Sequence, residues 1–482
     1  MAYQAVIGLE CHIQLTTRSK MFCECPAEFG AAANSNVCPV CLGLPGALPR
    51  VNRAAIDSAL RLGAALGCAI QGESVFARKN YFYPDMPKNY QITQYDRPLC
   101  EGGALPIPGP PSDREIPLIR IHAEEDTGKS FHPERHGDRR VSRVDFNRAG
   151  VPLLELVTEP AFHDPAECAA FLTALRRLVR WLGISGGDME KGQLRCDANV
   201  SLRPAGQTAL GVKTEIKNLN SIKSVERGLV VEIARQTAEL EAGRTITQAT
   251  LLYDAEQDRV AVMRTKEHAH DYRYFPEPDL PVLRVEAAWV DRARSELPEL
   301  PWRRATRLRE DYGLPAYDAG VLTEQRELAD YFETAARGAD AKLASNWIMT
   351  EVLRVMRERG WDVGAWERQV PPSRMRSFLG RVHARELPGP LAKQVFAWMI
   401  DEPGDVHELL ERHGARVQSS SEDLLPLVRA VLEEHPGPVA QYQAGKTATL
   451  GFLVGQVMKK SGGQAVPQTV QELLKQELAA KT

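Results

Sequence analysis

The chain has 482 residues, of which 43% are hydrophobic and 26% are charged, with a formal net charge of −3. This composition is ordinary for a globular protein, and the length allows roughly three domains of about 150 residues. The weak negative charge excludes a uniformly basic nucleic-acid coat protein, so an RNA-binding surface has to be a local patch.

Neither a membrane span nor an export signal is expected. No apolar run approaches the roughly 18 residues that a bilayer-spanning helix needs. The N-terminus MAYQAVIGLECHIQL has no basic segment and enters a strand pattern at once. Nine cysteines, an odd number in a long chain, favour free thiols or metal ligands over a disulfide framework. We therefore expect a cytoplasmic protein without a membrane partner.

Residues 1–292 are rich in short stretches typical of β-strands. AVIGLECHIQL (5–15), IPLIRIHAEED (116–126) and LRCDANVSLR (194–203) alternate apolar and polar residues, as half-buried strands do. Clusters of Gly, Pro, Asn and Asp separate such stretches. The sequence therefore predicts an α+β domain built on a mixed or antiparallel sheet.

Two helices are expected within this domain. The first spans about 165–182, with Asp164 as its N-cap and Pro165 at its first position. The second spans about 220–242, where apolar residues recur at helical spacing.

The remainder of the chain has a helical pattern. An all-α helical domain is predicted over 293–405, with breaks at LPGP (387–390) and EPGD (402–405). A small α-helical tail domain is predicted over 406–482, with a loop at HPGP (435–438).

Four cysteines form a C-x-C pair and a C-x-x-C pair, Cys23 with Cys25 and Cys38 with Cys41. Paired thiolates of this kind predict a tetrahedral zinc site, although C-x-C is tighter than the usual spacing. A closed set of four thiolates leaves no position for water, so the zinc is expected to be structural. The other five cysteines are isolated and are interpreted as buried apolar residues.

A second cluster is acidic. Glu10 and His12 are one residue apart, so a strand directs both to one face. Glu124, Glu125 and Asp126 follow another strand, and three adjacent acids repel one another unless a cation offsets the charge. Oxygen ligands suit magnesium rather than zinc, while a solvated acidic loop is the alternative.

Two stretches resemble the end of a phosphate-binding P-loop, GKS (128–130) and GKT (445–447). The glycine that this motif requires would fall at positions 123 and 440, and both are alanine. If the protein binds ATP, it does so without a P-loop.

Two further segments are candidates for anion binding. RKNYFYPDMPKNYQITQYD (78–96) interleaves cations such as Lys79 and Lys88 with tyrosines such as Tyr81 and Tyr83, a mixture that suits phosphates and bases. In the second segment Arg195, Asp197 and Asn199 alternate along a strand and share a face, which suits an ionic active-site floor. A surface loop and a solvated sheet face are the respective alternatives.

Taken together, these stretches resemble the B-subunit family of the bacterial aspartyl/glutamyl-tRNA amidotransferases. The most diagnostic stretch is VDFNRAGVPLLELV (144–157), which resembles the family signature. KNYFYPDMPKNYQI, EEDTGKS, LRCDANVSLR, KTEIKNLNS, DYRYFPEPDLP and GFLVGQVMKKSGG also resemble family segments. The resemblance covers essentially the whole chain.

The resemblance implies an activity and partners. The family's enzyme converts misacylated Asp-tRNA(Asn) or Glu-tRNA(Gln) to the amide, and its B subunit uses ATP to activate the side-chain carboxylate as an acyl phosphate. Ammonia comes from a separate amidase, the A subunit, and a small C subunit joins these two. The N-terminal domain should resemble the glutamine synthetase/guanidino kinase fold. Which tRNA is preferred, and whether a non-discriminating aminoacyl-tRNA synthetase joins the complex, remains open.

Site residues are expected in four groups. The magnesium ligands are Glu10, His12 and Glu125, and Glu124 and Glu155 are further candidates. Phosphates or the substrate carboxylate would be held by Lys79, Lys88 and Arg195, so the catalytic set is Glu10, His12, Lys79, Glu124, Glu125 and Arg195. Substrate or ATP would contact Tyr81, Tyr83, Lys88, Glu155, Asp197 and Asn199. The tail, whose family counterpart contacts the outer corner of tRNA, would bind tRNA through Lys446, Lys459 and Lys460.

Three rival interpretations fit these residues less well. A zinc hydrolase using Glu10 and His12 needs an open zinc site, which a closed set of four thiolates does not offer. A non-catalytic RNA-binding zinc protein would suit the arginine-rich residues 354–385 but leaves the carboxylates unexplained. The archaeal Glu-tRNA-specific relative carries an inserted domain for which this chain has no room.

Overall fold

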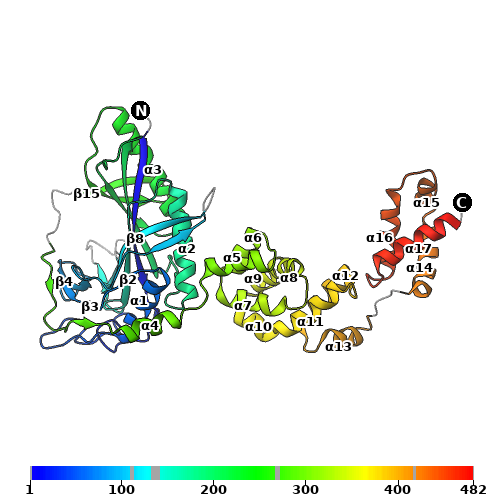
Figure 1. The fold of residues 1–482 in the computed structure, drawn as a ribbon, viewed down its shortest axis with the longest axis horizontal. Helices are drawn as coiled ribbons and strands as arrows, with labels where there is room; N and C mark the ends of the chain where they lie inside the picture. Colours follow the sequence, from blue (N-terminus) through cyan, green and yellow to red (C-terminus); the bar gives the residue numbers. More distant parts are fainter. Residues whose placement is uncertain (1–2, 109–112, 132–141, 266–271, 416–419, 481–482) are drawn as a thin grey trace, which may run out of the picture. The chain divides into compact units, whose positions relative to one another are not determined.

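The computed structural model describes residues 3–108, 113–131, 142–265, 272–415 and 420–480. The chain forms two compact units, Met1–Pro301 and Trp302–Thr482 (Figure 1). The first unit combines a large sheet with helices and the second is helical, so the predicted α+β class is confirmed.

One large sheet organises the first unit. Its strands run in the order β15-β14-β13-β12-β1-β11-β8-β6-β2, and β7 pairs with β8. Every neighbouring pair is antiparallel except β13 with β14. The strands are β1 (Tyr3–Gln14), β2 (Ala69–Ile70), β6 (Cys100–Glu101), β7 (Ala104–Ile107), β8 (Arg114–Glu125), β11 (Pro152–Thr158), β12 (Leu194–Pro204), β13 (Thr214–Leu219), β14 (Ala249–Asp254) and β15 (Arg259–Thr265).

Three small sheets accompany the large one, and the first of them runs in the order β16-β4-β5. Its strand β5 hydrogen-bonds through side chains and backbone to the end of β8, which ties the two sheets together. The strands are β3 (Glu73–Ser74) with β17 (Leu283–Arg284), β4 (Phe76–Asn80), β5 (Tyr90–Gln94) and β16 (Phe275–Pro276), and β9 (Lys129–Phe131) with β10 (Arg143–Asp145).

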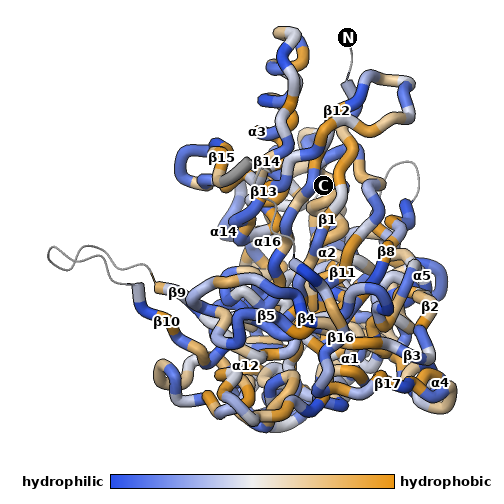
Figure 2. The backbone as a smooth tube through the Cα atoms, turned by 90° about the vertical axis from the view of Figure 1, so that its left-hand side faces the viewer, coloured by the Kyte–Doolittle hydropathy of each residue, from blue (hydrophilic) through white to orange (hydrophobic). Residues whose placement is uncertain are grey.

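The two faces of the large sheet differ in chemistry because side chains alternate along each strand. Apolar residues of β1 and β11, such as Ile13 and Leu154, are fully buried on the face covered by helices. The opposite face carries the ionisable residues of the same strands, including His12 and Glu155. In Figure 2, hydrophobic stretches run along the strands of this sheet.

The helices of the first unit are α1 (Arg53–Ala65), α2 (Pro165–Trp181), α3 (Ile222–Glu241) and α4 (Ala287–Ser295). Both predicted helices are confirmed. Asp164 caps α2 by accepting a hydrogen bond from the backbone of Ala166 at 2.9 Å, with Pro165 as the first helical residue. Helix α3 starts after Ser221, whose side chain accepts from the backbone of Ser224.

The predicted domain boundary at residue 292 falls inside α4. This helix packs on α1, and the indole of Trp289 donates to Asp57 at 2.5 Å. The first compact unit therefore extends to Pro301.

The second unit consists of helices, including one π-helical turn. Its elements are α5 (Pro301–Asp311), α6 (Ala316–Leu322), α7 (Arg326–Ala335), α8 (Ala341–Trp347), the π-turn η2 (Ile348–Val352), α9 (Leu353–Arg359), α10 (Val363–Gln369), α11 (Pro372–His383), α12 (Gly389–Asp401), α13 (Val406–Arg412), α14 (Ser421–Glu434), α15 (Pro436–Gln443), α16 (Thr449–Lys460) and α17 (Pro467–Ala480).

Two separate apolar cores lie in this unit. The first reaches from Leu308 to Ala415 and includes Val406 and Leu409 of α13. The second joins α14, α16 and α17, from Leu424 to Leu478. The predicted boundary at residue 406 thus precedes α13, which packs with the earlier core.

Local details of the tail differ partly from expectation. The HPGP stretch is not a loop, because α15 begins at Pro436, and proline at the first helical position is favourable. Helix α16 ends at Lys460, and Gly462 and Gly463 follow with φ of 59° and 79°. Among the residues described, no helix is both long and apolar enough to cross a membrane.

Candidate functional site

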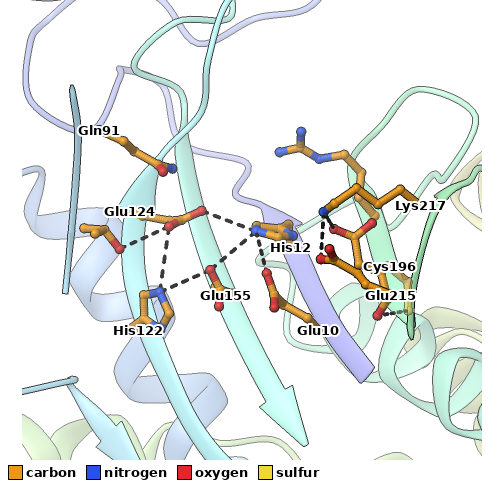
Figure 3. Close-up of polar contacts among 12 residues, drawn as sticks. Glu10, His12, Gln91, His122, Glu124, Glu155, Cys196, Glu215 and Lys217 are labelled. Carbon is orange, nitrogen blue, oxygen red and sulfur yellow. Dashed lines mark hydrogen bonds and ion pairs between the residues drawn. The ribbon is translucent and has the colours of Figure 1, made fainter. Parts of the chain in front are cut away.

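Four polar side chains form a row across the middle of the large sheet. Arg195 on β12 lies opposite His12 on β1, His12 lies opposite Glu155 on β11, and Glu155 lies opposite His122 on β8. Glu10 and Glu124 are two residues from His12 and His122, so strand alternation places them on the same face. We call Glu10, His12, His122, Glu124 and Glu155 the carboxylate–imidazole cluster (Figure 3).

The distances within this cluster are short. His12 Nε2 lies 3.4 Å from a Glu155 oxygen, 3.6 Å from a Glu124 oxygen and 3.9 Å from a Glu10 oxygen. His122 Nε2 lies 3.3 Å from the same Glu155 oxygen and 3.7 Å from Glu124. Figure 3 shows both imidazoles directed at the two carboxylates between them.

Burial is graded across the cluster. Glu124, Glu155 and His122 are 1%, 6% and 3% exposed, whereas the side chains of Glu10 and His12 are 32% and 19% exposed. The cluster is therefore closed on the β8 side and more accessible on the β1 side.

The carboxylates of the cluster favour positive charge on its two imidazoles. Burial opposes protonation of His122, but the carboxylates of Glu155 and Glu124 outweigh it and raise its pKa to about 9. Burial lowers the pKa of His12, but the hydrogen bond with Glu155 and the charges of Glu124 and Glu155 together outweigh burial and raise it. Burial works against charge on Glu155 as well, yet the two imidazoles hold its pKa well below the usual range.

The carboxylate–imidazole cluster contains two groups that could hold a metal ion. Glu10, His12 and Glu155 form one, and His122, Glu124 and Glu155 form the other, with ligand atoms within 4.8 Å of one another in each. A divalent cation would replace the protons that the imidazoles carry in the metal-free protein.

Glu125 lies in neither group, although it was predicted to ligate magnesium with Glu10 and His12. Lys88 forms an ion pair with its carboxylate, and the backbone of Ile92 donates to it at 2.9 Å. Neighbouring residues of a strand point to opposite sides, so Glu124 and not Glu125 shares the face of His122. In the structure Glu10 and His12 thus group with Glu155 rather than with Glu125, and the identity of the magnesium ligands stays a prediction.

The predicted cations lie around the cluster. Lys79 Nζ is 5.0 Å from the ring centre of Tyr272, and the carboxylates of Glu124 and Glu155 raise its pKa against the cost of burial. Arg195 forms an ion pair with Asp126 at 3.1 Å. Lys88 is committed to Glu125, so it is not a free phosphate ligand in this conformation.

The predicted substrate-contacting residues lie in two places, on strand β12 and in a group of tyrosine rings. Asp197 lies opposite Glu10 on β12 and pairs with Lys217 at 2.5 Å, and Asn199 shares this face. The Tyr81 ring contacts those of Tyr83 and Tyr272, each at 6.3 Å between centres.

His122 is the main residue that the sequence analysis missed. The signal was present, since the i and i+2 spacing that singled out Glu10 and His12 also relates His122 to Glu124. Tyr272 and Tyr274 were not predicted as site residues. Their contacts with residues 79–95 place them beside Lys79 and Tyr81.

The four predicted zinc cysteines come together in a separate place. The sulfur atoms of Cys23, Cys25, Cys38 and Cys41 lie within 4.8 Å of one another, and those of Cys38 and Cys41 are 3.9 Å apart. A tetrahedral zinc site with bonds of about 2.3 Å has sulfur–sulfur edges of about 3.8 Å. A hydrogen bond with Cys23 lowers the pKa of Cys41 to about 4. We call these residues the cysteine cluster.

The predicted tRNA-binding lysines lie in the second unit. Lys446 and Lys459 are exposed, whereas Lys460 pairs with Glu434 of α14 at 2.5 Å. Part of the basic charge predicted for this segment is thus neutralised by a residue distant in sequence.

Comparison with known proteins gives two family models. A GatB/GatE catalytic domain model matches residues 5–291, and a GatB domain model matches residues 330–478. The B subunit of the aspartyl/glutamyl-tRNA(Asn/Gln) amidotransferase of Pelodictyon phaeoclathratiforme is 49% identical over 99% of this chain and 100% of its own length. That of Moorella thermoacetica is 48% identical with the same coverage. The chain therefore belongs to the family of aspartyl/glutamyl-tRNA(Asn/Gln) amidotransferase B subunits.

Proposed function

We propose that this chain activates the side-chain carboxylate of Asp-tRNA(Asn) or Glu-tRNA(Gln) by ATP-dependent phosphorylation, for amidation with ammonia. The protein is a carbon–nitrogen ligase subunit of the amidotransferase class. The observation that carries the proposal is the carboxylate–imidazole cluster, in which buried acids and imidazoles converge on one sheet face. The N-terminal unit would then serve as a kinase-like domain of the glutamine synthetase/guanidino kinase type.

Magnesium fits the cluster better than zinc does. Three of its five side chains are carboxylates, and hard oxygen ligands suit magnesium. Glu10, His12 and Glu155 would hold one ion, and His122 and Glu124 extend the site toward β8. When bound, magnesium neutralises phosphate charge and orients the transferred group.

The reaction proceeds by two displacements. A side-chain carboxylate oxygen attacks the γ-phosphorus, the bond from phosphorus to the β,γ-bridging oxygen breaks, and ADP leaves. Ammonia then attacks the acyl carbon, and the carbon–oxygen bond to phosphate breaks. Lys79, which is charged beside the cluster, and Arg195, which Asp126 holds in place, would neutralise the phosphates. The tyrosines Tyr81 and Tyr83, with Asp197 and Asn199, would contact the substrates.

The cysteine cluster would hold a structural zinc ion. Four sulfur donors would fill a tetrahedral site and leave no open position, so no chemical step is assigned to it. We expect Cys38→Ser to lower zinc content and thermal stability together. A variant without zinc that melts like the wild type would contradict the structural role.

The proposed reaction requires partners. Ammonia would come from the amidase (A) subunit, and a small C subunit would complete the heterotrimer. The tail would bind the tRNA body through Lys446, Lys459 and Lys460, and translation would place the complex in the cytoplasm.

Oxygen-isotope transfer tests the chemical step. The substrate is Asp-tRNA(Asn) with ¹⁸O in the side-chain carboxylate, given to the assembled complex with ATP and an ammonia source. An acyl phosphate predicts that one ¹⁸O appears in inorganic phosphate for each amide formed. Amide formation with unlabelled phosphate would overturn the proposal.

A further inference from the structure

Lys20 is unusual among the lysines that the structure describes, because it alone is fully buried, at 0% exposure. Its ammonium donates to the carbonyl oxygen of Asn36 at 2.7 Å, to that of Phe146 at 3.3 Å and to the sulfur of Cys41 at 3.6 Å. Among the described ion pairs, none joins Lys20 to a carboxylate, whereas the neighbouring Lys88 pairs with Glu125.

A buried ammonium needs an anion. Removing such a charge from water is unfavourable, and carbonyl oxygens offset only part of that desolvation cost. The sulfur of Cys41 is the one group among the three partners that can carry a full negative charge. Four thiolates around a divalent zinc ion have a net charge of −2, so the cysteine cluster in turn needs a cation.

We propose that Lys20 is the counter-ion of the zinc centre and couples that centre to the loop Phe146–Gly150. The inference rests on the proposed zinc site and adds to it a residue that no spacing of cysteines reveals. The ammonium lowers the net charge of the zinc–thiolate group to −1 on its buried side, next to Cys41. Outer partners of this kind hold metal ligands in place.

The loop is joined to the cysteine cluster at several points. The backbone of Asn36 donates to the side chain of Asn147 at 2.8 Å, and that of Met21 donates to the carbonyl of Gly150 at 2.7 Å. Gly150 has a φ of 87°, and a Cβ atom there would lie 3.4 Å from both Lys20 and Cys41. The positive φ, rather than a lack of space, therefore favours glycine at this position.

The same loop contacts Asp126, which follows the strand that carries Glu124. The backbone of Gly150 donates to the carbonyl of Asp126 at 2.9 Å, and Arg148 lies 3.5 Å from the Asp126 carboxylate. Asp126 in turn holds Arg195, and the loop continues into β11, which carries Glu155. Lys20 is thus a positioning residue between the zinc centre and the proposed phosphoryl-transfer site.

Zinc release measures the proposed role directly. A cavity of about 820 Å³ lined by Cys23, Cys25 and Cys38 admits a small chelator. We expect Lys20→Met, which keeps the length of the apolar stem, to release zinc to a chromogenic chelator on the order of 10- to 100-fold faster than the wild type. The control Lys191→Met, at an exposed turn residue of the same unit, should release zinc at the wild-type rate.

A second measurement uses only the wild-type protein, so it tests the inference even if the Lys20→Met variant fails to fold. Amine acetylation followed by mass spectrometry should find Lys20 unmodified with zinc bound and modified after zinc is removed. Zinc-loaded protein with an unchanged release rate in Lys20→Met, or Lys20 protected equally after zinc removal, would overturn the inference alone. Wild-type protein purified without zinc would overturn the zinc centre and this inference together.

Discussion

The two compact units differ in where their buried charged side chains lie. In the first unit, one group of buried ionisable side chains lies near the middle of the large sheet, where His122, Glu124 and Glu155 are almost fully buried. In the second unit, the two cores are apolar, and the buried charged residues that the structure describes are Arg304 and Asp318.

The buried charges of the second unit have local structural partners. Arg304 pairs with Asp330 at 2.6 Å, and Asp318 pairs with Lys342 at 2.6 Å. The carboxylate–imidazole cluster instead holds three acids around two imidazoles, an arrangement that gains from an added cation. We therefore propose that the chemistry belongs to the sheet unit, and that the helical unit serves for packing and for presenting its surface.

Glu155→Gln should have the largest effect on activity. Glu155 is the one carboxylate shared by both possible metal groups and contacts both imidazoles. We expect a loss of about 10²- to 10³-fold in ATP turnover stimulated by misacylated tRNA, the loss typical when one preorganised electrostatic group is removed. Glutamine hydrolysis by the assembled complex should persist.

The matched control for this variant is Glu256→Gln, at an exposed turn residue of the same unit. It should turn over ATP at the wild-type rate. Wild-type activity in Glu155→Gln would mean that the cluster has no role in the reaction. Neither unit would then contain buried charged residues that act in catalysis.

Phe378→Ala should act on stability rather than on chemistry. Phe378 is fully buried in the first core of the helical unit and contacts Trp347 at 4.9 Å between ring centres. The cavity should cost about 3–5 kcal/mol of unfolding free energy in that unit. Hydrogen exchange resolved by unit would measure it, and equal deprotection of the β1 and β11 amides would contradict independent units.

The pH dependence of stability distinguishes the buried imidazoles. The folded pKa of His122, about 9, lies above its ordinary value of about 6.5. Its contribution to stability is therefore complete below about pH 6.5 and is lost as the pH rises through about 9. Denaturant unfolding of the metal-free protein should show this fall, and His122→Gln should flatten it.

His407→Gln, at an exposed histidine of α13, is the control for that experiment. A wild-type protein whose stability is constant from about pH 6.5 to 9 would mean that the cluster does not hold protons in place of a metal.

The smallest effect is expected at the tail. Lys459→Ala with Lys460→Ala should weaken tRNA binding a few-fold and reduce the slope of log affinity against log salt by roughly one to two, because each lost phosphate contact contributes about 0.7–0.9. Glu434→Gln should strengthen binding slightly, since it releases Lys460 from its ion pair. An unchanged salt slope in the double variant would mean that these lysines do not contact tRNA.

Local spacing explains what the sequence could predict. Cys23 and Cys25, or Glu10 and His12, lie within a few residues of each other, and turn geometry or strand alternation alone relates them. The capped helix α2 was likewise evident from Asp164 and Pro165. These features depend on neighbours in sequence, so they need no tertiary structure.

Pairings between distant segments could not be predicted in this way. Glu125 was predicted as a metal ligand from the acidic run that it forms with Glu124 and Asp126, but Lys88 reaches it from the segment that precedes β5. Lys20 lies in an unremarkable polar stretch of the sequence, yet folding buries it against Cys41 and Phe146. Strand register, which decides that Glu155 faces both His12 and His122, appears only when β1, β11 and β8 are aligned.

The central claim is that the carboxylate–imidazole cluster holds the divalent cation that serves ATP. Pulsed electron paramagnetic resonance of bound Mn²⁺, a substitute for magnesium, tests it most directly, because coupling to ¹⁴N reports histidine ligation. The account predicts Mn²⁺ with imidazole nitrogen coupling in the wild type, and loss of that coupling in Glu155→Gln and His12→Gln. Mn²⁺ bound without nitrogen coupling, or with the same coupling in both variants, would contradict it.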